Sequence, residues 1–408
     1  MKESVLVIGT GFQHFREYAL RGLAQRYRVV LVARSPLEWE LPYVAEYREA
    51  DLQDEAAVLA AAEDLAARNR IVGVVTWDEW LVAQAAEIGA RLGVRSMPTG
   101  AARSCRDKAM QRARFQEEGV PSARFHLAAS VAEAVAAADE IGYPVVVKPR
   151  GQAASIAVTI VHSEAELRET FEVVRGAESP SIGDGLVLVE EFLSGPEIAV
   201  DSWVLDGRVE PFSISAKRTD YPPFFEEVAH VVGKVLDSGT EAAVRDVVIA
   251  ANRALGVDRT VTHTELMLTA DGPRVVEVNG RLGGDLIPRL AEIAIPGLSI
   301  GGVLGAVATG REPDPIPEPD RLVGIRFLYP GADLTFDDIE VPAALADEPW
   351  VHEVRRVSEP GTELRLPPRQ FLGRAGYVIA TGADIAEIDA RLLALADSTT
   401  VVGEPLGV

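Results

Sequence analysis

The segment that most constrains the fold is a predicted β-hairpin at residues 262–285, with the sequence THTELMLTADGPRVVEVNGRLGGD. Its two short apolar runs flank an Ala-Asp-Gly turn, a pattern typical of paired antiparallel strands. Because side chains alternate between the faces of a strand, Glu277, Asn279 and Arg281 should share one face, and Glu265 could join them across the hairpin. Carboxylates gathered on one face repel each other, and a divalent cation between them would remove that repulsion.

The composition limits the class of protein. At 408 residues the chain is long for one hydrophobic core, and about 100–200 residues per domain predict two to four domains. The hydrophobic content of 48% and the charged content of 25% are typical of a soluble globular protein. The net charge of −22 argues against binding nucleic acid or an anionic membrane through the overall field, although a local basic pocket could hold a phosphorylated small molecule. Cys105 is the only cysteine, so neither a disulfide framework nor a Cys-based zinc site is predicted.

No targeting or membrane segment is predicted. The N-terminal stretch MKESVLVIGTGFQHF has an apolar run of four residues, too short for a signal-peptide core of about 7–15 residues. No apolar run approaches the roughly 18 residues that a membrane span requires. We therefore expect a soluble, cytoplasmic protein, and the single cysteine agrees with a reducing compartment.

Residues 1–100 predict an α/β domain. Apolar runs at 4–8, 28–33 and 71–77 are predicted as buried strands, and the alanine-rich stretch 54–68 as a helix. Strands that alternate with helices indicate a doubly wound parallel sheet. The glycines of GTGFQH lack the third glycine of a dinucleotide-binding motif, and no acidic residue closes the next strand. A tight strand-to-helix turn is the better interpretation.

Two further units follow in the central part of the chain, 101–195 and 196–310. The first is predicted to contain a helix that ends at Gly119 and two buried strands, PVVVKP and LVLVEEFL. The second is predicted to contain strands at 197–205 and 209–215, a helix near 240–255, and the hairpin.

The last part of the chain begins with a proline-rich stretch. REPDPIPEPD has four prolines in ten residues, which predicts a linker or an extended arm at 311–321. Residues 322–408 alternate short strands with a helix at 384–398 and are predicted to form a small C-terminal α/β domain.

Two lysines are candidates for binding phosphate. Lys148 ends an apolar strand, where a buried ammonium is costly unless an anion meets it. The loop RGQAAS at 150–155, which includes Ser155, could bring backbone N–H groups to phosphate oxygens, although an ordinary surface turn is also consistent with it. Lys108 begins a helix and is the second candidate, with a solvated side chain as the alternative.

The stretch VLVEEFLSGPE at 187–197 is typical of an adenine site. A strand edge that opens on a pocket offers backbone N–H and C=O groups to the ring, and Phe192 and Leu193 could cover its faces. Glu197 could accept hydrogen bonds from ribose hydroxyls. The alternative is two exposed acids, Glu190 and Glu191, beside a buried phenylalanine.

Taken in order, Lys108, Lys148, VEEFLSGPE, Glu265 and EVNGR resemble the ATP-grasp superfamily over residues 100–305. Residues 1–100 look like the α/β domain that precedes the ATP-grasp fold in such enzymes. EEFLSGPE is similar to the adenine-binding segment of D-alanine–D-alanine ligase. GVVTWDEWLVAQAA and GRAGYVIATGAD look like the L-amino acid ligases and other carboxylate–amine ligases of secondary metabolism. The resemblance thus implies an ATP-grasp fold, α/β (α+β) in class, between an N-terminal doubly wound parallel-sheet domain and a small C-terminal α/β domain.

The resemblance implies a role for each matching residue. Lys108 and Lys148 would contact the α- and β-phosphates of ATP, with Ser155 in the phosphate loop. Adenine would be held by Glu190, Glu191, Phe192 and Leu193, and the ribose by Glu197. One or two Mg²⁺ ions, or Mn²⁺, would be bound by Glu265, Glu277 and Asn279, whose hard oxygens suit these ions. The loop RGQAAS departs from the family pattern because it is poorer in glycine and serine.

Arg281 is the predicted catalytic residue. In this family the carboxylate of the first substrate attacks the γ-phosphate, and an amine then attacks the resulting acylphosphate. Arg281 could neutralise the carboxylate, the transferred phosphoryl group and the oxyanion in turn. A buried salt bridge to Glu265 or Glu277 is the alternative role.

Residues 215–233, SAKRTDYPPFFEEVAHVVG, are expected to lie over the cleft. Lys217 is a second catalytic candidate that could reach the terminal phosphates. Glu227 and His230 match substrate-contacting positions of L-amino acid ligases, where Glu227 could hold an ammonium group and His230 a carboxylate or a proton. A histidine with only structural hydrogen bonds is the alternative.

Two glycines and one histidine near the hairpin complete the candidates. Gly283 and Gly284 would leave room for a first substrate larger than alanine. His263 falls on the predicted metal face by alternation, and no role is assigned to it.

The expected function is an ATP-dependent, ADP-forming carboxylate–amine ligase that joins amino acids or similar small acids and amines. Its partners would be small-molecule substrates, without nucleic acid or membrane, and a homodimer is left open. Three alternatives remain: an amine acceptor on a carrier protein, a bicarbonate-using enzyme of the purine or biotin-carboxylase type, and a nucleotide-binding regulator without catalysis.

Overall fold

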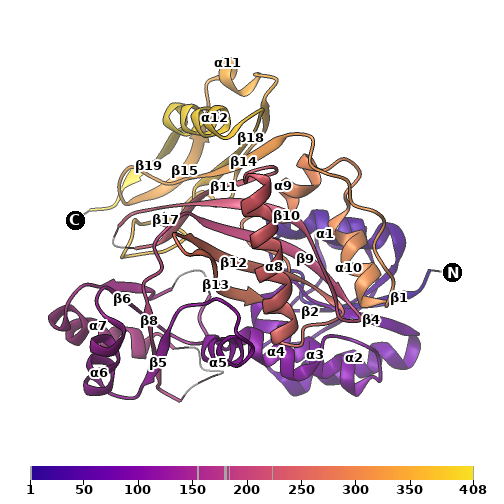
Figure 1. Ribbon diagram of the computed structural model, residues 1–408. Coiled ribbons are helices and arrows are strands. Elements are labelled where there is room, and N and C mark those ends of the chain that lie inside the picture. Colours follow the sequence, from indigo (N-terminus) through magenta and orange to yellow (C-terminus); the bar gives the residue numbers. More distant parts are fainter. Residues whose placement is uncertain (1, 154–155, 179–181, 183, 223, 408) are drawn as a thin grey trace.

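The computed structural model describes residues 2–153, 156–178, 182, 184–222 and 224–407 (Figure 1). The N-terminal unit is a parallel sheet with the strand order β3-β2-β1-β4. Its strands are β1 (Ser4–Ile8), β2 (Arg28–Ala33), β3 (Val44–Glu49) and β4 (Ile71–Val75). Its helices are α1 (Gln13–Arg26), α2 (Glu55–Arg68) and α3 (Val82–Arg91), and the short 3₁₀ helix η1 (Glu79–Leu81) follows β4. The predicted parallel α/β arrangement is confirmed, and β3 is an additional, half-exposed edge strand.

The second unit begins with helices α4 (Thr99–Arg106) and α5 (Lys108–Glu118). Gly119 closes α5 in the left-handed conformation, as predicted. A small antiparallel sheet follows, in the order β5-β8-β6-β7. Its strands are β5 (Phe125–Ala128), β6 (Val145–Lys148), β7 (Thr159–Val161) and β8 (Val187–Glu191). Helices α6 (Val131–Ile141) and α7 (Glu164–Gly176), which the sequence analysis did not predict, contact this sheet (Figure 1).

The centre of the molecule is an eight-stranded antiparallel sheet with the order β13-β12-β9-β10-β11-β14-β18-β16. The strands contributed by residues 196–310 are β9 (Glu197–Leu205), β10 (Arg208–Asp220), β11 (Glu226–Val232), β12 (Thr260–Thr269) and β13 (Gly272–Asn279). Residues 215–233 were expected to lie over the cleft, but most of them belong to β10 and β11 inside the sheet, where both edges of each strand are paired. Phe225 and Glu227, near the start of β11, do line a cavity.

The C-terminal segment continues this large sheet. Strands β14 (Leu322–Leu328), β16 (Val351–Arg356) and β18 (Gly376–Gly382) extend it beyond β11. Helix α12 (Ile385–Ser398), as predicted, covers β14 and β18. The remaining elements are the strands β15 (Leu334–Glu340), β17 (Glu363–Leu364) and β19 (Thr400–Pro405), which form a separate small sheet, and the short helix α11 (Ala343–Ala346). Residues 311–319 have no regular secondary structure, as their prolines predict.

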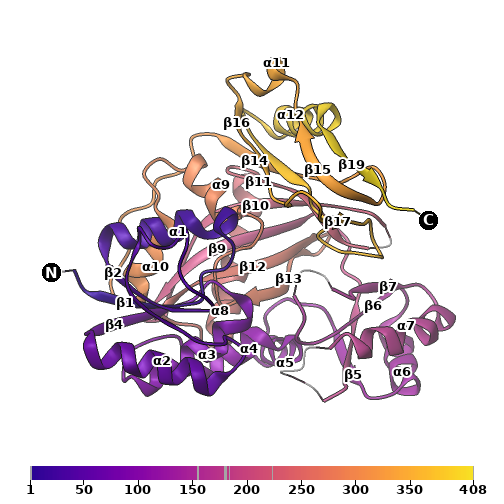
Figure 2. The ribbon, with the colours of Figure 1, turned by 180° about the vertical axis from the view of Figure 1, so that it is seen from behind.

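Helices connect the N-terminal unit to the large sheet. Helix α8 (Ser238–Ala254) contacts β10 and β13, α9 (Ile287–Ala294) contacts β10, β11 and β14, and α10 (Ile300–Ala308) contacts β9 and β12. Helix α10 also contacts α1 and β4, and the view from behind shows it beside the N-terminal sheet (Figure 2). The crossing is close, because a Cβ on Gly301 would lie 2.1 Å from the carbonyl oxygen of Ala19. No helix in the described part of the chain is long and apolar enough to cross a membrane.

Candidate active site

The hairpin forms as predicted and brings its two carboxylates together. Strands β12 and β13 pair with Glu265 directly opposite Glu277 and His263 opposite Asn279. A lysine neutralises each carboxylate: Lys217 Nζ lies 3.2 Å from Glu265 Oε2, and Lys108 Nζ lies 2.9 Å from Glu277 Oε1. Two of the predicted metal ligands therefore meet, and each carboxylate contacts one lysine in this structure.

The oxygens around Asn279 fit a cation. Its side-chain oxygen faces the carboxylates of Glu277 and Glu79, which is a repulsive arrangement. Turning the amide over would place its nitrogen 3.3 Å from Glu277 Oε1 and 3.2 Å from Glu79 Oε2. A hard cation among the three oxygens would remove the repulsion equally well, so the donor set is compatible with Mg²⁺.

Lys217 lies at the centre of a cluster of carboxylates. Besides Glu265, its Nζ lies 2.5 Å from Glu197 Oε1 and 3.1 Å from Glu227 Oε1. Burial opposes the charged ammonium, but the three carboxylates outweigh burial and raise the pKa of Lys217 well above its usual value. Contact of Lys217 with the terminal phosphates would require this cluster to open and stays a prediction.

Lys148 belongs to a buried triad of charges. Its Nζ lies 2.6 Å from Glu190 Oε2, and Arg112 Nε lies 2.8 Å from Glu190 Oε1. Burial would raise the pKa of Glu190, but Arg112 and Lys148 lower it below its usual value. The Glu190 carboxylate is therefore the counter-ion of two buried cations. Glu190 also lines the cavity at the hairpin, and its contact with adenine stays a prediction.

Glu191 is also engaged in ion pairs, at the rim of the pocket. Its Oε2 lies 2.9 Å from Arg274 Nη2 and 3.4 Å from Arg124 Nε, and its backbone N–H donates to the Arg124 carbonyl. Strand β8 ends at Glu191. Phe192 and Leu193 lie beyond it, so their backbone N–H and C=O groups are the ones expected to bind adenine.

A cavity of about 140 Å³ collects most of the residues predicted to bind nucleotide, together with two predicted metal ligands and one predicted substrate residue. Those that line it are Lys108, Lys148, Glu190, Glu191, Phe192, Leu193, Glu197, Glu227, Glu265 and Glu277. The sequence analysis missed Arg112, Val146, Met267 and Val276 in the same wall. Ligand pockets usually measure roughly 300–1,000 Å³, so the walls must separate to admit a nucleotide. The phosphate loop is one of these walls, since Lys108 Nζ donates to the Gln152 carbonyl at 2.6 Å; Ser155 lies outside the described residues.

Arg281 is anchored by the N-terminal unit. Its Nε lies 2.6 Å from Oε2 of Glu79, a buried residue of η1 that also pairs with Arg106. Burial raises the pKa of Glu79, but Arg281 and Arg106 outweigh it and lower that pKa below its usual value. The alternative expectation, a salt bridge from Arg281 to Glu265 or Glu277, is wrong, because its ion pair is with Glu79. Glu79 lies within TWDEW, directly after a predicted strand. That position is the sequence feature that could have identified it as a site residue.

The loop after Arg281 is packed more tightly than expected. A Cβ on Gly283 would lie 2.8 Å from His263 Nδ1, so the prediction that Gly283 enlarges a substrate pocket is wrong. Gly284 does face open space, since a Cβ there would meet no described residue within 4 Å apart from its chain neighbours. His263 was left without a role in the sequence analysis. Its Nδ1 lies 2.8 Å from Asp201 Oδ1, and its ring packs against the loop at Gly283.

Glu227 and His230 lie together on β11, although residues three apart on a regular strand point to opposite faces; the pairing of β10 with β11 shifts register beside them, between Arg218 and Thr219. His230 Nε2 lies 3.2 Å from Asp285 Oδ2 and 3.4 Å from Glu227 Oε2. Arg374, just before β18, donates to both oxygens of Asp285 at 2.6 and 2.8 Å. Asp285 has a left-handed backbone with φ of 50°, an uncommon conformation for a non-glycine residue. The sequence analysis missed both Asp285 and Arg374, which complete this cluster.

The protonation of His230 should stabilise the fold at low pH. Burial lowers the pKa of His230, but hydrogen bonds to Asp285 and Glu227 outweigh burial and raise it above 6.5. A raised pKa adds stability that is complete below the unfolded value and disappears as the pH rises through the folded value. The free-energy difference between wild type and His230→Asn should therefore be larger near pH 5.5 than near pH 8.5, about one to two units either side of the unperturbed value. Urea unfolding at both pH values measures it.

The exposed His162 supplies the control for this measurement. His162→Asn should give the same small free-energy difference at both pH values. A His230→Asn difference that grows with pH would contradict the assignment.

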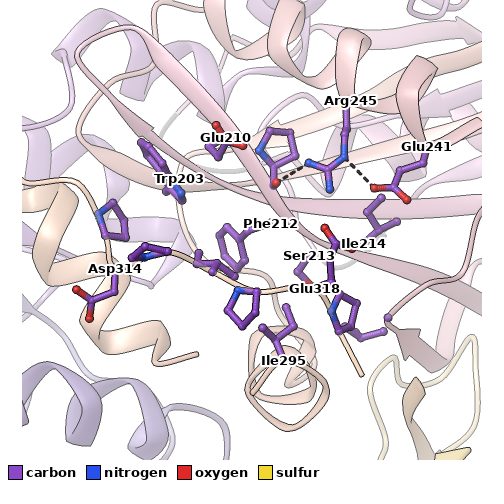
Figure 3. A pocket seen from close by; sticks show the side chains of 18 of the residues that line it. Trp203, Glu210, Phe212, Ser213, Ile214, Glu241, Arg245, Ile295, Asp314 and Glu318 are labelled. Atoms are coloured by element: carbon purple, nitrogen blue, oxygen red, sulfur yellow. Dashed lines mark hydrogen bonds and ion pairs between the residues drawn. The ribbon is translucent and has the colours of Figure 1, made fainter. Parts of the chain in front are cut away.

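A second cavity, of about 360 Å³, lies away from the hairpin between β9, β10 and residues 312–319 (Figure 3). Its charged groups pair among themselves: Arg245 Nε lies 2.9 Å from Glu241 Oε1, and Arg208 lies 3.1 Å from both Glu210 and Glu312. Its one lysine, Lys234, is exposed and lies 3.8 Å from the exposed Glu318, so it offers no buried cluster of lysines and carboxylates among the described residues, and we place the candidate active site at the smaller cavity.

The antiparallel sheets and the lysine–carboxylate pocket between them define the class of protein as an ATP-grasp ligase. The ATP-grasp domain model matches residues 141–289, and the model of the L-amino acid ligase C-terminal domain 2 matches residues 326–404. The chain belongs to the ATP-grasp family of carbon–nitrogen ligases. Enzymes of this family bind ATP with Mg²⁺.

Individual relatives support the same family. Phosphoribosylamine–glycine ligase of Streptomyces coelicolor is 31% identical over 94% of this chain and 92% of its own length. Alanine–anticapsin ligase of Bacillus subtilis is 27% identical over 59% of this chain, and the chain spans about half of that relative, 54%. The crystal structure of an L-amino acid ligase from Bacillus licheniformis superimposes with a TM-score of 0.84 at 23% identity, over 99% of this chain and all of that one.

Proposed function

We propose that this protein is an ATP-dependent, ADP-forming ligase that joins the carboxylate of an amino acid or similar small acid to an amine through an acylphosphate. The observation that carries the proposal is the convergence of the hairpin carboxylates Glu265 and Glu277, two lysines and the cavity in one place, with Arg281 at the end of the same hairpin.

The nucleotide side of the site is electropositive where phosphate would lie. Lys148, Arg112 and Glu190 together carry one excess positive charge, and all three line the cavity. An excess buried cation is costly unless an anion meets it, so this wall favours a polyphosphate. Mg²⁺ bound by Glu265, Glu277 and Asn279 would neutralise further phosphate charge when present.

The reaction divides into two displacements. A carboxylate oxygen of the first substrate attacks the γ-phosphorus of ATP, the bond to the β-phosphate oxygen breaks, and ADP leaves. The amine nitrogen of the second substrate then attacks the acyl carbon, inorganic phosphate leaves, and the nitrogen loses a proton. Arg281, held by Glu79 at 2.6 Å, would donate hydrogen bonds to the charge that develops on the carboxylate and the oxyanion.

The substrate side of the site supports an amino acid as the first substrate. Glu227 is partly exposed to the cavity, and Lys217 and His230 keep it ionised by lowering its pKa to about 2 against the effect of burial. An ionised carboxylate at this position suits the ammonium group of an amino acid. Bicarbonate has no ammonium group, so this observation favours a ligase that uses amino acids over an enzyme that uses bicarbonate.

The test is phosphate release from Mg-ATP by the purified chain, with the twenty amino acids offered singly and in pairs. We expect release that requires amino acids, and a product whose mass is the sum of two substrates minus water. Release with bicarbonate alone would move the protein to the carboxylase type. Binding of ATP without any release, even when hydroxylamine replaces the amine, would favour a nucleotide-binding regulator instead.

A further inference from the structure

Arg16 lies on the helix that faces the loop after Arg281. It belongs to the first turns of α1, far from the hairpin in sequence. Its Nη1 donates a hydrogen bond to the carbonyl of Gly283 at 3.0 Å. One N–H group of a guanidinium that carries five is thereby used, and the contact places Arg16 beside the reaction centre.

Arg16 differs from the other arginines around the site in having no carboxylate partner. Arg281 pairs with Glu79, and Arg374 pairs with Asp285. Arg16 forms no ion pair with any residue that the structure describes, although its side chain is partly buried. An arginine removed from water without a counter-ion is costly, so its position indicates a place for an anion.

The surroundings of Arg16 also favour an anion. Burial lowers the pKa of Arg16 and outweighs the opposing effect of Tyr18, while the charge of Arg281 lowers it further against a smaller effect of Asp78. Helix α1 begins without a side-chain cap and without an acidic residue in its first turn, so its N-terminal charge adds to that of the guanidinium. Gly284, next to the residue that Arg16 contacts, faces open space.

The chemistry of the reaction identifies which anion this is. The reacting carboxylate of the first substrate must lie against Arg281 and the γ-phosphate, and its ammonium group against Glu227. An amino acid that acts as the amine places its nitrogen at the acyl carbon and keeps a free carboxylate a few bonds away. We propose that Arg16 binds the carboxylate of an amino acid that acts as the amine, and that this residue thereby sets the preference of the site for a charged acceptor over a neutral one. This inference rests on the proposed function.

The test compares an acceptor amino acid with its own carboxamide, for example glycine with glycinamide. Both carry the amine, and only the first carries the negative charge. For the wild type we expect kcat/KM for the amino acid to exceed that for the amide by about 10- to 100-fold, as for a charged group that loses its partner. In Arg16→Gln this preference should vanish through a higher KM for the amino acid, while the KM for the amide stays unchanged. Arg16→Lys should keep part of the preference.

Two controls separate this inference from the function on which it rests. Hydroxylamine traps the acylphosphate as a hydroxamate without using the acceptor site, so its rate should be equal in wild type and Arg16→Gln. Arg21→Ala, which removes an exposed arginine from the same helix, should change none of these values. Absence of hydroxamate from the wild type with every acid would overturn the proposed function itself. Hydroxamate formation with equal use of acid and amide by the wild type, or an equal loss for both in Arg16→Gln, would overturn the role of Arg16 alone.

Discussion

Replacement of Arg281 by alanine is expected to lower kcat by about 100- to 1,000-fold, the usual cost of removing a donor aimed at developing charge. The guanidinium is partly buried, its Nε is held by Glu79, and its Nη1 donates to the Leu282 carbonyl. The remaining N–H groups are therefore pre-oriented, and the charge they would stabilise exists mainly in the transition states. The affinity for Mg-ATP, measured by calorimetry, should change little because Arg281 does not line the nucleotide cavity.

Two variants test whether this loss is specific. Arg289→Ala removes a nearby arginine that pairs with Glu292 at 3.0 Å on α9, and it should keep nearly full activity. Glu79→Gln keeps Arg281 but weakens its anchor, so its loss of kcat should lie between those of the two alanine variants. Full turnover by Arg281→Ala would refute the catalytic assignment, and equal losses in both arginine variants would indicate a general effect on folding.

The elements that could be predicted from the sequence are those whose own residues show a clear pattern of apolar and polar side chains. Strands β1 and β2 are continuous apolar runs, and the hairpin has a turn signal between alternating strands. Strand β3, VAEYRE, was missed because an edge strand keeps half-exposed polar side chains. Helices α6 and α7 were missed although each begins with a capping box. Ser130 caps the N–H of Glu133, and Ser163 caps that of Glu166.

The candidate site was predictable where one segment carries several groups and not where distant segments meet. Glu277 and Asn279 follow from strand alternation, because their spacing places them on one face, and Glu265 joins them across the hairpin through the pairing of the two strands. Arg281 and Asp285 follow the hairpin, but their partners lie in distant parts of the chain. Glu79 from the N-terminal unit pairs with Arg281, and Arg374 from the C-terminal segment pairs with Asp285. No periodicity in the sequence relates such residues, because their contacts depend on how sheets and helices pack. The same reason explains why the ion pair of Glu190 with Lys148 was not predicted.

Replacement of Glu190 by alanine is expected to destabilise the protein by about 3–5 kcal/mol, the usual cost of removing one partner from a buried ion pair. The carboxylate neutralises both Lys148 and Arg112, and all three side chains are almost completely buried. Its loss would leave two like charges close together in a region that excludes water. Urea unfolding monitored by tryptophan fluorescence measures the change. Because Lys148 and Arg112 lower the pKa of Glu190, its contribution should persist at neutral pH and disappear only as the pH falls through that lowered value.

The adjacent Glu191 provides the matched control, since it has the same side chain on the same strand and also contacts two arginines. It is partly exposed, and water can replace its contacts with Arg124 and Arg274, so Glu191→Ala should cost no more than about 1 kcal/mol. Similar losses for the two variants would mean that burial does not distinguish them and that Glu190 is an ordinary rim residue. A large loss for Glu190→Ala that saturating Mg-ATP partly reverses would instead place the two cations against phosphate, because a bound polyphosphate supplies the negative charge that the variant lacks.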